Sequence, residues 1–186
     1  YEASIADFIY NTNKIENYNL SIEECIESAK LFLMGYPTQY ISDNPHIKST
    51  LNTIVKSVSL DSIDNISKII AIHKEFDPIV IERENPGSIR HYSHMSPTGK
   101  QYAEPFEIVD LLKGVCNMKK PILKHAAYEW VHPFCDGNGR SGRIILLSDL
   151  DYNFEHANDI MNDDYIRMLS TFMKHNDVRK IINRSK

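Results

Sequence analysis

Twelve residues in the second half of the chain, HPFCDGNGRSGR from His132 to Arg143, combine the groups that phosphate chemistry requires. The glycine-rich part, residues 137–139, directly precedes an apolar helical run, so its backbone can adopt left-handed angles and turn several N–H groups toward one point. Unpaired amides at a helix N-terminus favour an anion. Arg140 and Arg143 lie three apart and share a face of the first helical turn. Arginine binds phosphate oxygens bidentately. The pattern therefore predicts a cradle for more than one phosphate.

Two further residues of this segment supply a base and a metal ligand. Asp136 is a hard oxygen ligand beside the expected phosphates, where Mg²⁺ can be held. His132 ends the preceding helix and can accept a proton near neutral pH. Base, carboxylate and cradle together favour transfer of a phosphate-containing group from a nucleotide to an incoming hydroxyl. The spacing differs from both the P-loop and the dinucleotide-binding patterns, so neither fold is implied. A glycine turn alone often only caps helices, but that reading must explain each of these residues separately.

Size and composition describe one globular domain. The chain has 186 residues, 42% of them hydrophobic and 25% charged, enough for a single packed core. Its net charge of -4 gives no sign of a nucleic-acid partner. Three widely spaced cysteines, Cys25, Cys116 and Cys135, argue against a disulfide framework, and we expect a cytoplasmic protein. No apolar stretch reaches the roughly 18–20 residues that span a bilayer, so we expect no membrane partner; the sequence leaves an oligomer open.

Helical periodicity dominates the chain. A stripe of Ile5, Phe8, Ile9 and Thr12 predicts a first helix, which the polar run 11–19 ends. Further helices are predicted after a Ser21 cap, over 44–58, over 61–76 with a cap at Asp61 or Ser62, and after Pro105 and Pro121. Further helices are expected after the glycine turn 137–139, over 162–175 and over 178–184. Residues 89–103 lack a helical stripe and predict a short hairpin around SPTG. We expect one all-α domain over 1–186, with the flap hairpin at 89–103 and a helix–loop–helix at 121–152.

The central motif resembles the signature of the Fic (Fido) family, H-P-F-x-[DE]-G-N-G-R-x-x-R. Every fixed position matches: His132, Pro133, Phe134, Asp136, Gly137, Asn138, Gly139, Arg140 and Arg143. The segments NPGSIR, HAAYEWVHPF and DYIRML also look like family counterparts. The resemblance implies a Fic-fold helical bundle and transfer of AMP from ATP to a Ser, Thr or Tyr hydroxyl of a target protein.

The resemblance also implies a role for each matched residue. His132 is expected to deprotonate the target hydroxyl, and Asp136 to hold Mg²⁺. The backbone of Gly137, Asn138 and Gly139 is expected to bind the α-phosphate, and Arg140 and Arg143 the outer phosphates. Doc-type relatives have Lys where Gly137 stands and transfer the terminal phosphate instead, so Gly137 favours nucleotidyl transfer. The expected nucleotide site also includes Ser141, Gly142, the flap residues Thr98, Gly99, Lys100 and Gln101, and Tyr165, which stacks on adenine or packs in the core.

A second motif lies at the start of the chain. TNKIEN, Thr12 to Asn17, resembles the family's inhibitory motif [ST]-x-x-x-E-[GN]. Glu16 is then expected to pair with Arg143, so that the guanidinium meant for the γ-phosphate is occupied. Residues 1–20 are thus expected to form an inhibitory segment, in which Thr12 and Asn17 are the other motif positions.

Three alternatives remain at this stage. The same site can remove AMP, with Glu16 orienting a water, or use another nucleotide such as UTP. A non-catalytic module can bind a nucleotide in the cradle and a peptide at the flap. For the expected transferase, ATP and a target protein that adds a strand to the flap are the partners. His91 and His94 are expected to face solvent, and His73 to be a core or boundary residue.

Overall fold

The computed structural model describes residues 1–81, 85–96 and 99–185. Within these residues the helices are α1 (Glu2–Lys14), α2 (Ile22–Leu33), α3 (Pro45–Ser59), α4 (Ile66–His73), α5 (Ile108–Asn117), α6 (Pro121–Val131), α7 (Asn138–Asp149), α8 (Phe154–Ile160), α9 (Tyr165–His175) and α10 (Val178–Asn183). Short 3₁₀ turns cover Thr38–Tyr40 and Pro105–Glu107. The predicted all-α class is confirmed.

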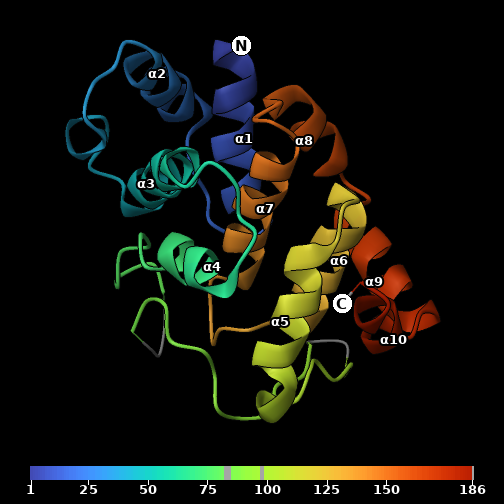
Figure 1. Cartoon of the computed structure of the whole chain (residues 1–186). Coiled ribbons are helices and arrows are strands. Elements are labelled where there is room, and N and C mark those ends of the chain that lie inside the picture. Colours follow the sequence, from blue (N-terminus) through green and yellow to red (C-terminus); the bar gives the residue numbers. More distant parts are fainter. Residues whose placement is uncertain (82–84, 97–98, 186) are drawn as a thin grey trace.

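Helix α7 lies at the centre of the molecule, between α1 and α3 on one side and α6 on the other (Figure 1). It can occupy this place because most of its residues are buried, including the apolar run from Ile144 to Leu147. The loop that carries the central motif joins α6 to α7, so the most buried helix of the fold positions it.

Helix starts follow local side-chain chemistry. The side chain of Asn44 accepts from the His46 N–H before Pro45, and Ser21 Oγ accepts from the Glu24 N–H, as capping residues do. The expected cap of α4 at Asp61 or Ser62 is wrong: the helix begins after Asn65, whose side chain accepts from the Lys68 N–H. Helix α8 has no counterpart in the sequence-based expectation, because a polar-rich helix of about two turns carries no clear apolar stripe.

The flap hairpin is not confirmed as a pair of strands. In the described part of 89–103 the β pairings are isolated antiparallel bridges, Met95 to Gln101 and Ile89 to Phe134. The Ser96 N–H donates to the Lys100 carbonyl at 2.8 Å, which closes a tight turn. Thr98, one of the expected nucleotide-binding residues, lies outside the described residues.

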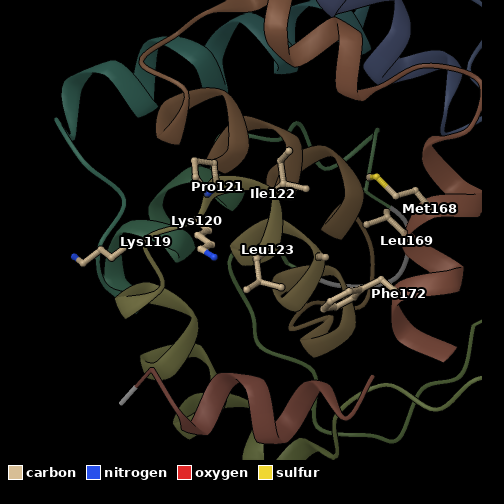
Figure 2. A pocket seen from close by; sticks show the side chains of 9 residues that line it. Lys119, Lys120, Pro121, Ile122, Leu123, Met168, Leu169 and Phe172 are labelled. Atoms are coloured by element: carbon tan, nitrogen blue, oxygen red, sulfur yellow. The ribbon is translucent and has the colours of Figure 1, made fainter. Parts of the chain in front are cut away.

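A largely apolar groove of about 560 Å³ runs between the first turns of α6 and the middle of α9 (Figure 2). Lys119 and Lys120 lie at one end of it, and Met168, Leu169 and Phe172 form its α9 side. This groove is at the opposite end of α6 from His132, so it is separate from the central motif. None of the helices in the described residues combines the length and the apolar character needed to span a bilayer.

Candidate functional site

The loop between α6 and α7 is held in an open turn by its own side chains. Gly137 has φ +74°, a left-handed angle that favours glycine. The side-chain amide of Asn138 donates to the Phe134 carbonyl at 2.7 Å, and its oxygen accepts from the Phe134 N–H at 2.8 Å. This pair of hydrogen bonds fixes the loop, so the Asn138 side chain has a structural role. The N–H groups of 138–140 open α7 and lack helical acceptors, as at any helix start. They remain suited to an anion.

His132 lies at the other end of the loop, in a left-handed conformation with φ +49°. Its Nδ1–H donates to the Glu129 carbonyl at 3.3 Å, which leaves Nε2 as the unprotonated nitrogen. The ring stacks on Tyr102 with centroids 3.9 Å apart and lies 5.3 Å from the ring of His94. Burial, and to a smaller extent His94, lowers the pKa of His132 to about 3. The imidazole is therefore neutral at pH 7 and can accept a proton.

Arg90 ties the flap segment to this histidine, and the sequence analysis assigned it no role. Its Nε donates to the His132 carbonyl at 2.6 Å and its Nη1 to the Tyr92 carbonyl at 2.7 Å. Nη2 donates to the carbonyls of Ala103 and Val131. The side chain is 1% exposed. A guanidinium with five donors in a rigid fork thus fixes the end of α6 and both sides of the flap at once.

His73 is a second positioning residue, and the expectation that it is a core or boundary histidine agrees with its 2% exposure. Its Nε2–H donates to the Asp136 carbonyl at 2.8 Å, and its Nδ1 accepts from the Gly87 N–H at 2.7 Å. The ring stacks on Phe134 at 3.7 Å. Burial lowers the pKa of His73 to about 4, so the neutral form that makes both bonds is the stable one.

Arg140 presents unpaired donors at the start of α7. Its guanidinium lies between the rings of Tyr18 and Phe76, 5.3 and 5.2 Å from their centroids. Its Nη2 lies 3.5 Å from Asp136 Oδ1, a long and weak contact. The side chain is 3% exposed, and in the described structure Nε and Nη1 have no hydrogen-bond partner. Buried donors of a charged group are costly when unpaired, so this site is arranged for an anion.

Arg143 is engaged by the N-terminal segment through two of its three guanidinium nitrogens. Its Nε donates to Thr12 Oγ1 at 2.8 Å, and its Nη2 donates to the Thr12 carbonyl at 3.0 Å and to Glu16 Oε1 at 2.5 Å. Burial alone lowers the pKa of Arg143, but the Glu16 carboxylate outweighs it and raises that pKa above its usual range. The Glu16 oxygen also lies against Gly139, where a Cβ would collide with it. Asn17 follows with φ +64°, an angle that Asn tolerates and that turns the chain after Glu16.

Three residues of the expected nucleotide site make packing contacts in this structure. Ser141 Oγ donates to the Gly137 carbonyl at 2.8 Å and bonds the Tyr128 hydroxyl. Gly142 lets α6 and α7 approach, since a Cβ there would collide with Glu129. The Tyr165 hydroxyl bonds His125 Nε2 at 2.7 Å, and its ring is 1% exposed. Tyr165 therefore packs in the core below Arg143 and does not offer a face to adenine.

Of the expected flap residues, Gly99, Lys100 and Gln101 belong to the described part of the chain. Gly99 has φ +78°, and Gln101 Nε2 donates to the Glu104 carboxylate. The Lys100 Nζ is buried without a hydrogen-bond partner in the described structure, and burial lowers the pKa of Lys100. Contact of these residues with a nucleotide stays a prediction.

The carboxylate of Asp136 fits a metal that arrives with a nucleotide. Among the described residues there is no group of three or more His, Cys, Asp or Glu side chains that could hold an ion. The Asp136 side chain is 29% exposed, and its Oδ1 accepts from the Gly137 N–H at 2.6 Å. Mg²⁺ is commonly held by one or two carboxylates together with phosphate oxygens. Asp136 beside the unpaired donors of Arg140 matches that donor set.

Comparison with known sequences finds a family match over the region that contains this site. The sequence profile of the Fic/DOC family matches residues 62–148. A probable protein adenylyltransferase of Aquifex aeolicus is 38% identical over 52 residues, 23% of this chain and 16% of that protein. A Fido domain-containing protein of Dictyostelium discoideum is 32% identical over 95 residues, 50% of this chain and 57% of that protein. Both alignments cover less than two thirds of the relative.

Solved structures share the fold across nearly the whole chain. A Fic domain containing signaling protein from Bacteroides thetaiotaomicron superposes with a TM-score of 0.59 at 16% identity, over 97% of this chain and 84% of that one. A Fic family protein from Desulfovibrio desulfuricans gives a TM-score of 0.63 at 17% identity, over 98% of this chain and 62% of that one. At these identities the likeness concerns the fold alone.

Proposed function

We propose that the chain is a member of the Fic/DOC (Fido) family, whose profile matches residues 62–148, and that it is a protein adenylyltransferase that Glu16 holds in a repressed state. One observation carries this proposal. The motif loop has a neutral imidazole with a free acceptor nitrogen at one end, and a buried guanidinium with unpaired donors at the other. The name of the Aquifex aeolicus relative, a probable protein adenylyltransferase, points the same way.

The chemistry assigned to the site is an in-line displacement. His132 Nε2 takes the proton of a target hydroxyl, and the oxygen forms a bond to the α-phosphorus of ATP. The bond from the α-phosphorus to the oxygen that bridges to the β-phosphorus breaks, and pyrophosphate leaves. Positioning and charge neutralisation provide most of the acceleration in such reactions.

The chain's own groups provide that positioning. The amides that open α7, those of 138–140, receive the α-phosphate, and Arg140 binds an outer phosphate through its unpaired donors. Asp136 would hold Mg²⁺, which neutralises charge on the phosphates when bound. Arg90 and His73 keep the two ends of the loop at a fixed separation through their bonds to the His132 and Asp136 carbonyls.

Repression follows from the occupancy of Arg143. While Glu16 and Thr12 take its donors, the guanidinium cannot bind the γ-phosphate, and the Glu16 carboxylate repels a triphosphate at Gly139. ATP can then bind only with its γ-phosphate away from Arg143, in a pose that does not lead to transfer. Relief requires that Glu16 leaves Arg143.

Labelled nucleotides test this proposal. We expect Glu16→Gly to transfer label to protein from α-labelled ATP and none from γ-labelled ATP, at a rate well above wild type. Adding His132→Ala to that variant should abolish transfer. Glu2→Gly, which removes an exposed carboxylate from α1, is the control and should behave as wild type. Transfer of the γ-label, or a stronger signal from UTP or GTP, would assign the site a different donor chemistry.

A further inference from the structure

Aromatic side chains form a continuous strip from the protein surface to His132. The ring of Tyr102 stacks on His132 at 3.9 Å with an interplanar angle of 6°. The ring of His94 lies 5.6 Å from Tyr102 and 5.3 Å from His132, nearly parallel to both. Tyr92 lies 6.2 Å from His94, and His91 lies 5.8 Å from Tyr92. We call these four flap residues, His91, Tyr92, His94 and Tyr102, the ring strip.

The ring strip is fixed relative to the base. The Tyr102 N–H donates to the His94 carbonyl at 3.1 Å. Arg90 donates to the Tyr92 carbonyl and to the His132 carbonyl, so the strip and the base share one anchor. The outer end is open to solvent, since His91 is exposed and Tyr92 is 37% exposed. A side chain that approaches His132 along the flap therefore meets rings first.

The ring strip favours the binding of another aromatic ring. Aromatic pairs gain energy beyond the area they bury when their centroids lie about 4.5–7 Å apart. A tyrosine covers a strip of this kind and carries its hydroxyl at the far end of the ring, whereas serine and threonine are too short to cover it. The strip thus selects a flat acceptor with a terminal hydroxyl.

The chemistry of the base agrees with that geometry. Burial and the neighbouring His94 make His132 a weak base, with its pKa lowered to about 3. A phenol loses its proton far more readily than an alkyl hydroxyl, since its ordinary pKa is about 10. Proton transfer is most efficient when the pKa values of the donor and the acceptor are close. A phenol is closer in pKa to His132 than an alkyl hydroxyl is.

We propose that the acceptor of this enzyme is a tyrosine, whose ring binds against the ring strip. The transfer step rests on the proposed function, whereas the binding of a phenol to the strip does not. In that step the phenol oxygen bonds to the α-phosphorus, its proton moves to His132 Nε2, and pyrophosphate leaves.

Binding is tested first, without nucleotide, in the wild-type chain. N-acetyl-tyrosinamide is titrated while the ring-proton resonances of His94 and His132 are followed by NMR. We expect a saturable shift, and a dissociation constant raised roughly 2- to 10-fold by Tyr92→Ala, the range that one aromatic pair provides. Tyr40→Ala removes a tyrosine that is 73% exposed elsewhere on the surface and should leave the constant unchanged. Equal binding of N-acetyl-threoninamide, or no effect of Tyr92→Ala, would overturn the assignment.

Transfer is tested next, in the Glu16→Gly variant with ATP and an equimolar mixture of the tyrosine, threonine and serine amides. Mass spectrometry should find the AMP ester on the tyrosine amide and on tyrosines of modified protein. Esters mainly on threonine or serine would refute the acceptor assignment. Selective tyrosinamide binding without AMP transfer to any acceptor would support the ring strip as a binding site and contradict the proposed function.

Discussion

Replacing Glu16 by glutamine keeps the shape of the side chain and removes its charge from a guanidinium 2.5 Å away. Arg143 is 1% exposed, while the Glu16 side chain is 29% exposed. Breaking a buried ion pair by removing one partner costs about 3–5 kcal/mol, and an exposed pair is worth about 0.2–1 kcal/mol. Arg143 keeps both bonds to Thr12, and the glutamine oxygen can still accept. We therefore expect a loss of about 2 kcal/mol in the free energy of unfolding.

For a chain of this size that loss lowers the melting temperature by roughly 4–8 °C, which thermal unfolding followed by circular dichroism measures. ATP with Mg²⁺ should then raise the melting temperature of Glu16→Gln more than that of wild type, because the phosphates supply the missing anion. Glu2→Gln, at an exposed site on the same helix, is the control for removing a carboxylate. A melting temperature equal to wild type, or an equal response to ATP, would show that the pair neither stabilises the fold nor competes with nucleotide.

Three further changes test the positioning groups. Arg90→Met should destabilise the fold by roughly 3 kcal/mol or more in urea unfolding, since several buried carbonyls lose their donor; a small loss would contradict its anchoring role. Gly137→Ala should lower stability by about 1–2 kcal/mol because of its φ of +74°, and a neutral effect would show that the turn relaxes easily. Burial depresses the pKa of His73 to about 4 and of His125 to about 3 from 6.5, so their contribution is present above pH 6.5 and is lost on acidification. At pH 5 each histidine should lower the free energy of unfolding by about 2 kcal/mol. Glu129, whose pKa burial raises to about 7, should offset part of this loss because its carboxyl is protonated in the fold at that pH. Stability curves of wild type and His125→Asn between pH 7.5 and 5 measure this, and identical curves would contradict it.

The sequence predicts the parts of the site whose chemistry is local. The turn at Gly137 and the helix start after it follow from glycines placed before an apolar run, and they need no knowledge of the rest of the fold. The contact between Glu16 and Arg143 spans 127 positions, and it could be expected only through the resemblance of TNKIEN to a family motif. Spacing alone would not have joined these two residues.

Residues that act through tertiary contacts escape such reasoning. Arg90 is one arginine in an irregular segment, and its importance comes from carbonyls of α6 that lie more than forty positions away. The expectation that His94 faces solvent holds only in part, since His94 is half-buried and its ring lies beside Tyr102 and His132, contacts that its position in the sequence does not reveal. Tyr165 is polar enough to suit a ligand site, but its hydroxyl is satisfied inside the core by His125.

A crystal structure of Glu16→Gly with ATP and Mg²⁺ tests the central claim most directly. The account predicts the α-phosphate on the amides that open α7, the outer phosphates on Arg140 and the released Arg143, and Nε2 of His132 facing the α-phosphorus. A triphosphate bound elsewhere, or bound here with the His132 ring turned away from it, would contradict the account.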